Sequence, residues 1–260
     1  MDNELSRYFI TLSYDGTRYH GWQIQPNGIS VQGELQHALS LLLRHDVQVT
    51  GAGRTDTGVH ARMMVAHFDF PTLPSHLSPP TPHLVYKLNR LLPCDIAVQK
   101  IEPVAPDMHA RFSATSRTYR YFVHTGKQPF LRHYSLELHY ALDFTLMNEA
   151  AALLLGYDDF GAFCKSHTDV KTTICHVTHA QWHQVAGDSA STTGNSAWYF
   201  EITANRFLRN MVRAVVGTLV EVGRGRLSIE AFRKVIEGRQ RTEAGESMPA
   251  HALFLENITY

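Results

Sequence analysis

The chain has 260 residues, 44% of them hydrophobic and 18% charged, and its formal net charge is zero. This composition predicts a well-packed globular protein of one large or two moderate domains. Zero net charge excludes a protein that coats RNA through a uniformly basic surface, but it is compatible with a local basic cleft. No uninterrupted apolar run reaches the roughly 18 residues that a membrane helix needs, so we expect no membrane association.

The first half of the chain alternates strand-like and helix-like patterns. Apolar periodicity predicts strands at Tyr8–Tyr14, Met64–Phe70 and Asp95–Ile101, and helices from Val31 to about Arg44 and from His83 to Leu92. Ser30 is a suitable N-cap for the first helix. This order favours an α+β fold with helices on one side of a mainly antiparallel sheet.

An aromatic and amide-rich loop, Tyr19-His20-Gly21-Trp22-Gln23-x-Gln25, lies between the first strand and the first helix. Two interpretations stay open from the residues alone. The loop is either held in place by a buried Trp22, or it is a surface that stacks on RNA bases and hydrogen-bonds their edges.

A glycine-rich segment follows the short β-like run Val47–Thr50. It reads Gly51-Ala52-Gly53-Arg54-Thr55-Asp56-Thr57-Gly58-Val59-His60-Ala61 and leads into the next strand, so it is a loop between strands. Glycines at this density indicate unusual backbone angles or the close approach of a ligand. One acid, Asp56, lies two residues after one base, Arg54, and a carboxylate carried this way is a candidate reactive group.

Three other interpretations of this loop remain. It could be a plain turn with a solvated aspartate. It could bind phosphate, although it lacks the Gly-Lys-Ser/Thr sequence and Asp56 would repel a phosphate. It could hold a metal through Asp56, His60 and His67, although their spacing matches no familiar ligand pattern.

The second half repeats the mixture of strands and helices. The pattern predicts strands at Arg117–Val123, Thr173–Gln184 and Ala197–Ala204 and at the C-terminus, and helices at Asp143–Gly156, Arg206–Val222 and Ile229–Glu237. Pro103–Pro106 marks the join, so we expect domains at residues 1–106 and 107–260.

The strand Arg117–Val123 places Arg117, Tyr119 and Tyr121 on one face. This face is either part of an edge strand with cross-strand aromatic pairs or a wall on which a base stacks beside a phenol available for proton chemistry.

The segment Arg206–Val222 is predicted to be a helix with an apolar stripe and a basic face. Arginines at 206, 209 and 213 share that face, and those at 224 and 226 extend it against a single acid, Glu221. The face is either simply solvated or a local binding surface for a polyanion.

Taken together, these segments resemble the TruA family of tRNA pseudouridine synthases. The opening motif is Tyr14-Asp15-Gly16-x-x-Tyr19-x-Gly21-Trp22-Gln23, and the loop motif is Gly53-Arg54-Thr55-Asp56-x-Gly58-Val59-His60-Ala61. Further matches are His109-Ala110-Arg111-Phe112-Ser113-Ala114 with Tyr119-x-Tyr121, and Phe207-Leu208-x-x-Met211-Val212-Arg213-x-x-Val216-Gly217-x-Leu219. The closing motif departs from the family at Ala252, where glycine is usual.

The resemblance implies Asp56 as the catalytic carboxylate, Tyr119 as the active-site tyrosine and Arg213 as the partner of Asp56. It also implies that Arg54 helps to place the RNA. We expect further substrate-binding roles for Tyr19, Trp22, Gln23, His60, Arg111, Arg206, Arg209 and Leu219. The implied fold is two related α+β halves around a central, mainly antiparallel sheet, with the active site in a cleft between them.

The implied reaction is isomerisation of uridine to pseudouridine at positions thirty-eight to forty of the tRNA anticodon stem-loop. The implied partners are tRNA and a second copy of the chain in a homodimer. The reaction needs no redox change or hydrolysis, so we expect no cofactor and no metal. Cys94, Cys164 and Cys175 lack CxxC spacing and the acidic N-terminus has no signal core, so we expect a cytoplasmic location.

Two other functions remain open from the sequence. The chain could be a related RNA-binding module without turnover. It could also be a metal hydrolase that uses some of its sixteen histidines, although these are scattered along the chain rather than clustered.

Overall fold

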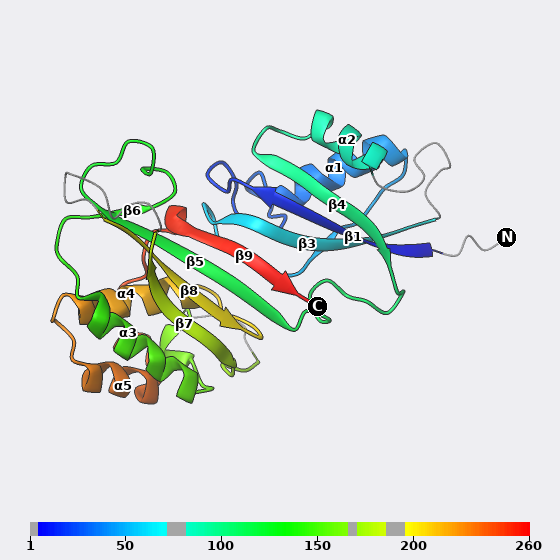
Figure 1. Cartoon of the computed structure of the whole chain (residues 1–260). Coiled ribbons are helices and arrows are strands. Elements are labelled where there is room, and N and C mark those ends of the chain that lie inside the picture. Colours follow the sequence, from blue (N-terminus) through cyan, green and yellow to red (C-terminus); the bar gives the residue numbers. More distant parts are fainter. Residues whose placement is uncertain (1–4, 72–81, 166–170, 186–195) are drawn as a thin grey trace. The chain divides into compact units, whose positions relative to one another are not determined.

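The structure is a computed structural model that describes residues 5–71, 82–165, 171–185 and 196–260 (Figure 1). The chain divides into two compact units: unit 1 comprises Met1–Thr115 with Leu255–Tyr260, and unit 2 comprises Ser116–Phe254. The functional domains expected at 1–106 and 107–260 stay a prediction. Within the described ranges, no helix is both long and apolar enough to cross a membrane.

Unit 1 is built on an antiparallel sheet with the order β4-β1-β3. Strand β1 (Leu5–Tyr14) pairs with β3 (His60–Pro71) and with β4 (Ile96–Val104), and the short β2 (Thr50–Gly51) pairs with β3. Helices α1 (Val31–Leu43) and α2 (Pro82–Leu91) contact one another, and α2 packs against β4 (Figure 1). The predicted cap is confirmed, because the Ser30 side chain accepts a hydrogen bond from the Gly33 amide.

Unit 2 also has an antiparallel sheet, in the order β5-β8-β7. The strands are β5 (Ser116–Thr125), β8 (Ala197–Ala204) and β7 (Val177–Gln184), and the short β6 (Leu136–Leu138) lies parallel to β5. Helix α3 (Phe144–Leu153) packs on β7 and contacts α4 (Met211–Gly223) and α5 (Ile229–Gly238). Figure 1 shows these three helices gathered on one side of the strands. The α+β class is therefore confirmed.

Three short 3₁₀ helices and the last strand complete the described elements. The 3₁₀ helices are η2 (Leu154–Gly156), η3 (Gly161–Phe163) and η5 (Ala250–Ala252), and the strand is β9 (Leu253–Thr259). Ala252 is fully buried, and positive φ among the described non-glycine residues occurs at other positions. The backbone at this departure from the family motif is therefore compatible with alanine.

The two faces of the unit 2 sheet have different characters. On β8, Phe200 and Ile202 are buried toward the helices, whereas Tyr199, Glu201 and Thr203 are half-buried on the opposite face. We call this opposite face the polar face of unit 2. The alternation predicted for these strands is confirmed, and it separates the apolar core from a row of polar side chains.

One predicted helix boundary is wrong. Helix α4 begins at Met211 rather than at Arg206, because Asn210 has a φ of 67°, in the left-handed region, and interrupts the helical run. The Asn210 side chain donates a hydrogen bond to Ser247, a contact from much later in the chain. Every α4 residue except Arg213 and Glu221 is buried, so α4 is a core helix and not a helix with a basic face.

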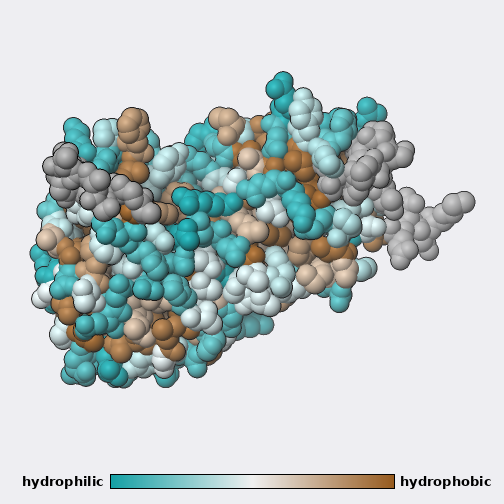
Figure 2. All heavy atoms as spheres, viewed as in Figure 1, coloured by the Kyte–Doolittle hydropathy of each residue, from teal (hydrophilic) through white to brown (hydrophobic). Residues whose placement is uncertain are grey.

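Apolar and polar side chains are mixed over the surface visible in Figure 2. Among the residues that the structure describes, the most exposed large apolar side chains are Phe130 at 92% and Phe112 at 77%. Scattered apolar residues of this kind are normal on a protein surface and do not by themselves mark a binding site.

Candidate active site

The Asp56 loop connects β2 to β3 in unit 1 and contains a tight turn immediately after Asp56. The Val59 amide donates a hydrogen bond to the Asp56 carbonyl at 3.1 Å, and Gly58 has a φ of +79°. A side chain at Gly58 would be strained in this conformation, which explains the glycine. Asp56 is half-buried and Arg54 is exposed, so the acid lies partly shielded beside a solvent-facing cation.

The opening motif holds this loop from both sides of the acid. The hydroxyls of Tyr14 and Thr55 are hydrogen-bonded at 2.9 Å, and both residues are buried. The Trp22 amide donates to the Thr55 carbonyl at 3.4 Å, and the Gly58 amide donates to the Tyr19 carbonyl at 3.4 Å. Because Thr55 directly precedes Asp56, these contacts restrict where the carboxylate can lie.

Two glycines of the opening motif are needed because the backbone of the Asp56 loop packs directly against them. A Cβ at Gly21 would lie 2.2 Å from the Thr55 carbonyl oxygen, and Gly21 also has a φ of +87°. A Cβ at Gly16 would lie 2.0 Å from the Val59 carbonyl oxygen. The two motifs therefore form one packed backbone structure, and any larger residue at either glycine would push the Asp56 loop away.

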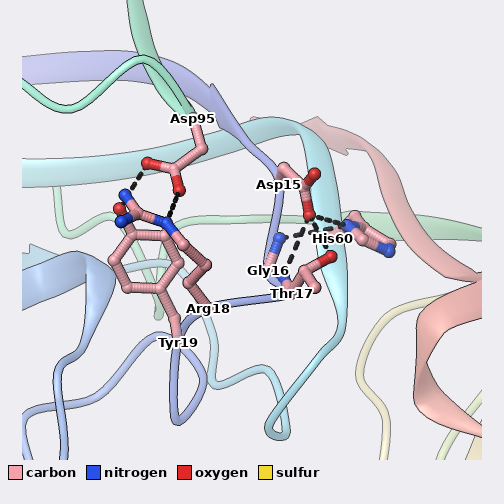
Figure 3. Close-up of polar contacts among 7 residues, drawn as sticks. All are labelled: Asp15, Gly16, Thr17, Arg18, Tyr19, His60 and Asp95. Carbon is pink, nitrogen blue, oxygen red and sulfur yellow. Dashed lines mark hydrogen bonds and ion pairs between the residues drawn. The ribbon is translucent and has the colours of Figure 1, made fainter. Parts of the chain in front are cut away.

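His60 joins the start of β3 to the turn after β1 (Figure 3). Its Nδ1 lies 3.0 Å from the Gly16 amide nitrogen and 3.1 Å from an Asp15 oxygen. The same Asp15 oxygen accepts hydrogen bonds from the Thr17 amide and hydroxyl. With only 1% of its side chain exposed, His60 supports the loop from inside the protein.

Asp95 anchors the outer part of the same region, as Figure 3 shows. The Tyr19 hydroxyl donates to one Asp95 oxygen and the Arg18 Nε to the other, each at 2.5 Å. Burial opposes ionisation of Asp95, but the hydrogen bonds from Arg18 and Tyr19 prevail and lower its pKa. Burial and the bond to Asp95 raise the pKa of Tyr19, so this phenol stays protonated and acts as a donor.

These contacts bear on the residues expected to bind substrate. Tyr19 and Trp22 are each only 2% exposed, and the Trp22 ring fills the space where Gly51 has no side chain. This burial favours the packing interpretation of Trp22 over stacking on a base. Gln23 is half-buried, and Arg54 remains the exposed candidate beside Asp56.

A second group in unit 1 surrounds His67 and contains Arg111. The Ala110 amide donates a hydrogen bond to His67 Nδ1 at 3.2 Å. The Arg111 amide donates one to His109 Nδ1 at 3.1 Å. Burial lowers the pKa of His67 to about 4, so it is neutral at physiological pH. Arg111 is exposed and lies over the Phe112 ring.

The metal site considered for the Asp56 loop does not form. In the part of the chain that the structure describes, Asp56, His60 and His67 are not among the groups close enough to share an ion. The Nδ1 atoms of both histidines also face backbone amides instead.

In unit 2, Tyr119 and Tyr121 follow one another on the helix-facing side of β5 but differ in exposure. Tyr119 is half-buried, and its ring meets that of Phe207 edge-on with centroids 5.0 Å apart. Tyr121 is fully buried, and its hydroxyl donates to the Pro249 carbonyl at 2.9 Å. Burial also raises the pKa of Tyr121. Because Tyr121 is fully buried and Tyr119 is only half-buried, Tyr119 is the more accessible phenol of the two.

Arg213 is the half-buried cation of α4, and the segment before η5 holds it in place. Its Nε donates to the Met248 carbonyl, and the Met248 amide donates to the Arg213 carbonyl at 3.1 Å. One bond of this reciprocal pair restrains the guanidinium itself and the other the Arg213 backbone, so the side chain has a defined direction.

The remaining arginines do not form one continuous basic face. Arg224 is paired with Glu221 at 2.8 Å and lies over the Tyr140 ring. Arg206 and Arg209 precede α4, and Arg209 is the exposed one of the two. Leu219 is fully buried in α4, where its contacts are those of a core residue.

Sequence reasoning singled out Asp56 as the candidate acid but missed how its loop is supported. The Tyr14–Thr55 bond and the close approaches at Gly16 and Gly21 join residues about forty positions apart. The only signal in the sequence was the glycine spacing of the opening motif, which we interpreted as part of a resemblance rather than as a packing requirement.

Comparison with known proteins agrees with the resemblance. The family model described as tRNA pseudouridine synthase matches residues 10–113 and 150–260. A tRNA pseudouridine synthase A of Bacteroides thetaiotaomicron is 57% identical, covering 98% of this chain and 91% of the relative. Those of Bacteroides fragilis and Bacillus subtilis are 56% and 40% identical; each match covers 98% of this chain, and 97% and 99% of the relatives. The chain therefore belongs to the tRNA pseudouridine synthase family, whose members are isomerases.

Proposed function

We propose that this protein isomerises uridine to pseudouridine in tRNA, at positions thirty-eight to forty of the anticodon stem-loop, with Asp56 as the catalytic carboxylate. The observation that carries the proposal is the support of the Asp56 loop by the opening motif. Thr55 is held through its hydroxyl by Tyr14 and through its carbonyl by Trp22. A carboxylate that must meet a specific atom of a nucleotide benefits from such restriction, because small misplacements cost large factors in rate.

The chemistry needs a carboxylate, an acceptor for the C5 proton and a donor of a proton to N1. The bond between N1 of uracil and C1′ of ribose breaks, and a bond between C5 and C1′ forms. The C5 proton leaves and N1 gains a proton, so atoms and charge balance without an oxidant, a reductant or water as a reactant. An ionised Asp56 can attack the sugar or the base or stabilise a glycal-like intermediate.

Tyr119 and Arg213 complete the proposed machinery. Tyr119 would stack on the extruded base and take part in proton transfer from C5, because its phenol is the accessible one of the β5 pair. Arg213 would pair with the Asp56 carboxylate, as the family resemblance implies, through the attraction of opposite charges. Its reciprocal hydrogen bonds with Met248 suit it to a positioning role.

The proposed substrate-binding residues divide into two groups by exposure. Arg54, Arg111 and Arg209 are exposed and can meet phosphates directly, whereas Tyr19, Trp22 and His60 are buried and would act by holding the loop. We also propose a cytoplasmic homodimer. Two copies of a neutral chain can join separate basic patches into one groove for an RNA.

The test is to incubate the purified protein with an unmodified tRNA transcript and to map pseudouridine by chemical labelling and primer extension. We expect wild type to label uridines at positions thirty-eight to forty, and Asp56→Ala to bind the transcript without modifying it. Asp46→Ala removes an exposed acid from the same unit and serves as the control, with activity unchanged.

Two results would contradict the proposal. If wild type binds tRNA but produces no pseudouridine, the chain is a binding module. If Asp56→Ala retains activity, the carboxylate lies elsewhere. Tyr119→Phe separates the roles of the phenol: retained binding with much slower turnover supports proton transfer, and a normal rate leaves stacking alone.

A further inference from the structure

Two histidines and a glutamate converge on the polar face of unit 2. His179 and His183 lie on β7 and Glu201 lies on β8, and their potential ligand atoms are all within 4.8 Å of one another. We propose that His179, His183 and Glu201 bind one divalent transition-metal ion of the zinc type.

Strand pairing brings the three side chains together. Gln181 pairs with Glu201, so the two histidines lie two positions on either side of the residue opposite the glutamate. Side chains at these diagonal positions can reach one another across an antiparallel pair. The pairing also shifts register between Val177 and His179, and such irregularities increase local twist and redirect the side chains that follow.

The contact between His179 and Glu201 already has the spacing of a metal site. In tetrahedral zinc sites the ligand atoms lie about 2.0–2.1 Å from the ion and therefore about 3.4 Å from each other. His179 Nε2 and Glu201 Oε1 are 3.5 Å apart. The third ligand atom, on His183, lies within 4.8 Å of the other two, so binding of an ion would need only a small approach of the three side chains.

A second observation points to a ligand at this place. The Nε2 atom of His179 is buried and has no hydrogen-bond partner. A buried polar atom without a partner is costly, so its presence calls for an explanation such as a bound ion. The nitrogen lies on the side of the ring that faces Glu201, where the ion would bind.

Arg120 orients the glutamate without occupying the site. Its Nε donates to Glu201 Oε2 at 2.6 Å, and its guanidinium lies over the Tyr199 ring. Oε1 is therefore directed toward His179, as expected for a carboxylate held by an outer partner. Two imidazoles and one carboxylate oxygen suit zinc and similar ions and do not suit magnesium, which prefers oxygen ligands.

The ion would stabilise the pairing of β7 with β8. In the strand order of unit 2, β7 is the terminal strand and pairs only with β8 among the described strands. An ion shared by both strands would add a cross-link on the polar face, opposite the helices. This proposal departs from our expectation of no metal, which followed from a reaction that needs neither redox change nor hydrolysis. The histidines are also scattered along the sequence, so the sequence did not show that two of them lie beside Glu201. It is independent of the isomerase chemistry.

The test uses the full chain after removal of metals with a chelator. Calorimetric titration with Zn²⁺ should show one ion per chain whose affinity falls more than about tenfold in His179→Gln and in His183→Gln. His139→Gln removes an exposed histidine outside the cluster and should leave binding unchanged. Zn²⁺ should raise the melting temperature of wild type and of the control, and Mg²⁺ should not.

A footprinting experiment on wild type covers the case in which the variants fold poorly. Diethyl pyrocarbonate acylates accessible imidazoles, and bound Zn²⁺ should protect the half-buried His183 but not the exposed His139. Zn²⁺ affinity that is equal in all the variants, or acylation of His183 that Zn²⁺ does not change, would overturn the proposal.

Discussion

Replacing Tyr14 by phenylalanine tests whether the opening motif positions the Asp56 loop, which we propose to be catalytic. The change removes one hydroxyl and leaves the ring in place. Tyr14 and Thr55 are 4% and 8% exposed, and their hydroxyls are 2.9 Å apart, so the bond is shielded from water. A neutral hydrogen bond contributes about 1 kcal/mol, and leaving a buried partner unsatisfied raises the cost, so we expect a loss of about 1–2 kcal/mol.

The stability assay is thermal unfolding. For a chain of this size the loss corresponds to a decrease of about 2–4 °C in melting temperature. Tyr86→Phe is the matched control, because Tyr86 is 62% exposed on α2. A double change, Tyr14→Phe with Thr55→Val, removes both partners and should cost less than the sum of the single changes.

The activity assay separates positioning from general damage. Thr55 directly precedes Asp56, so loss of the Tyr14–Thr55 hydrogen bond should make the position of Asp56 less well defined. We expect kcat for pseudouridine formation to fall by about tenfold in Tyr14→Phe, while tRNA affinity stays within about twofold of wild type. An unchanged melting temperature together with an unchanged kcat would refute the reasoning. Strictly additive single and double changes would show that the two hydroxyls do not depend on each other.

Three further predictions concern other parts of the chain. Gly21→Ala should destabilise the protein by about 2 kcal/mol or more in thermal unfolding, because φ is +87° and its Cβ would meet Thr55, whereas Gly53→Ala has open space and should be tolerated. His67 has a folded pKa of about 4, below its ordinary value of 6.5, so the unfolded chain binds the proton first. Stability should fall by about 2 kcal/mol in urea unfolding between pH 7 and pH 5, and His67→Gln should lack this contribution. Arg209→Glu should weaken tRNA binding and flatten its salt dependence, and an unchanged affinity would place the RNA surface elsewhere.

Local patterns in the sequence determined most of the secondary structure. The strand Ala197–Ala204 was predicted to the residue, and Ser30 was identified as the cap that begins α1. Both depend on neighbouring residues: alternation of apolar side chains in the first case, and a hydroxyl that reaches an amide three residues later in the second. The same kind of local information marked Asp56 as the notable acid, because its glycine-rich setting is visible in the chain itself.

Only the tertiary structure decided what those residues contact. The left-handed Asn210, which moved the start of α4, is bonded to Ser247. The burial of Trp22 depends on the missing side chain of Gly51. Glu201 meets His179 because of a strand register that no local pattern encodes. The physical reason is common to all three: secondary structure follows from short-range sterics and periodicity, whereas burial and convergence arise when distant segments pack together.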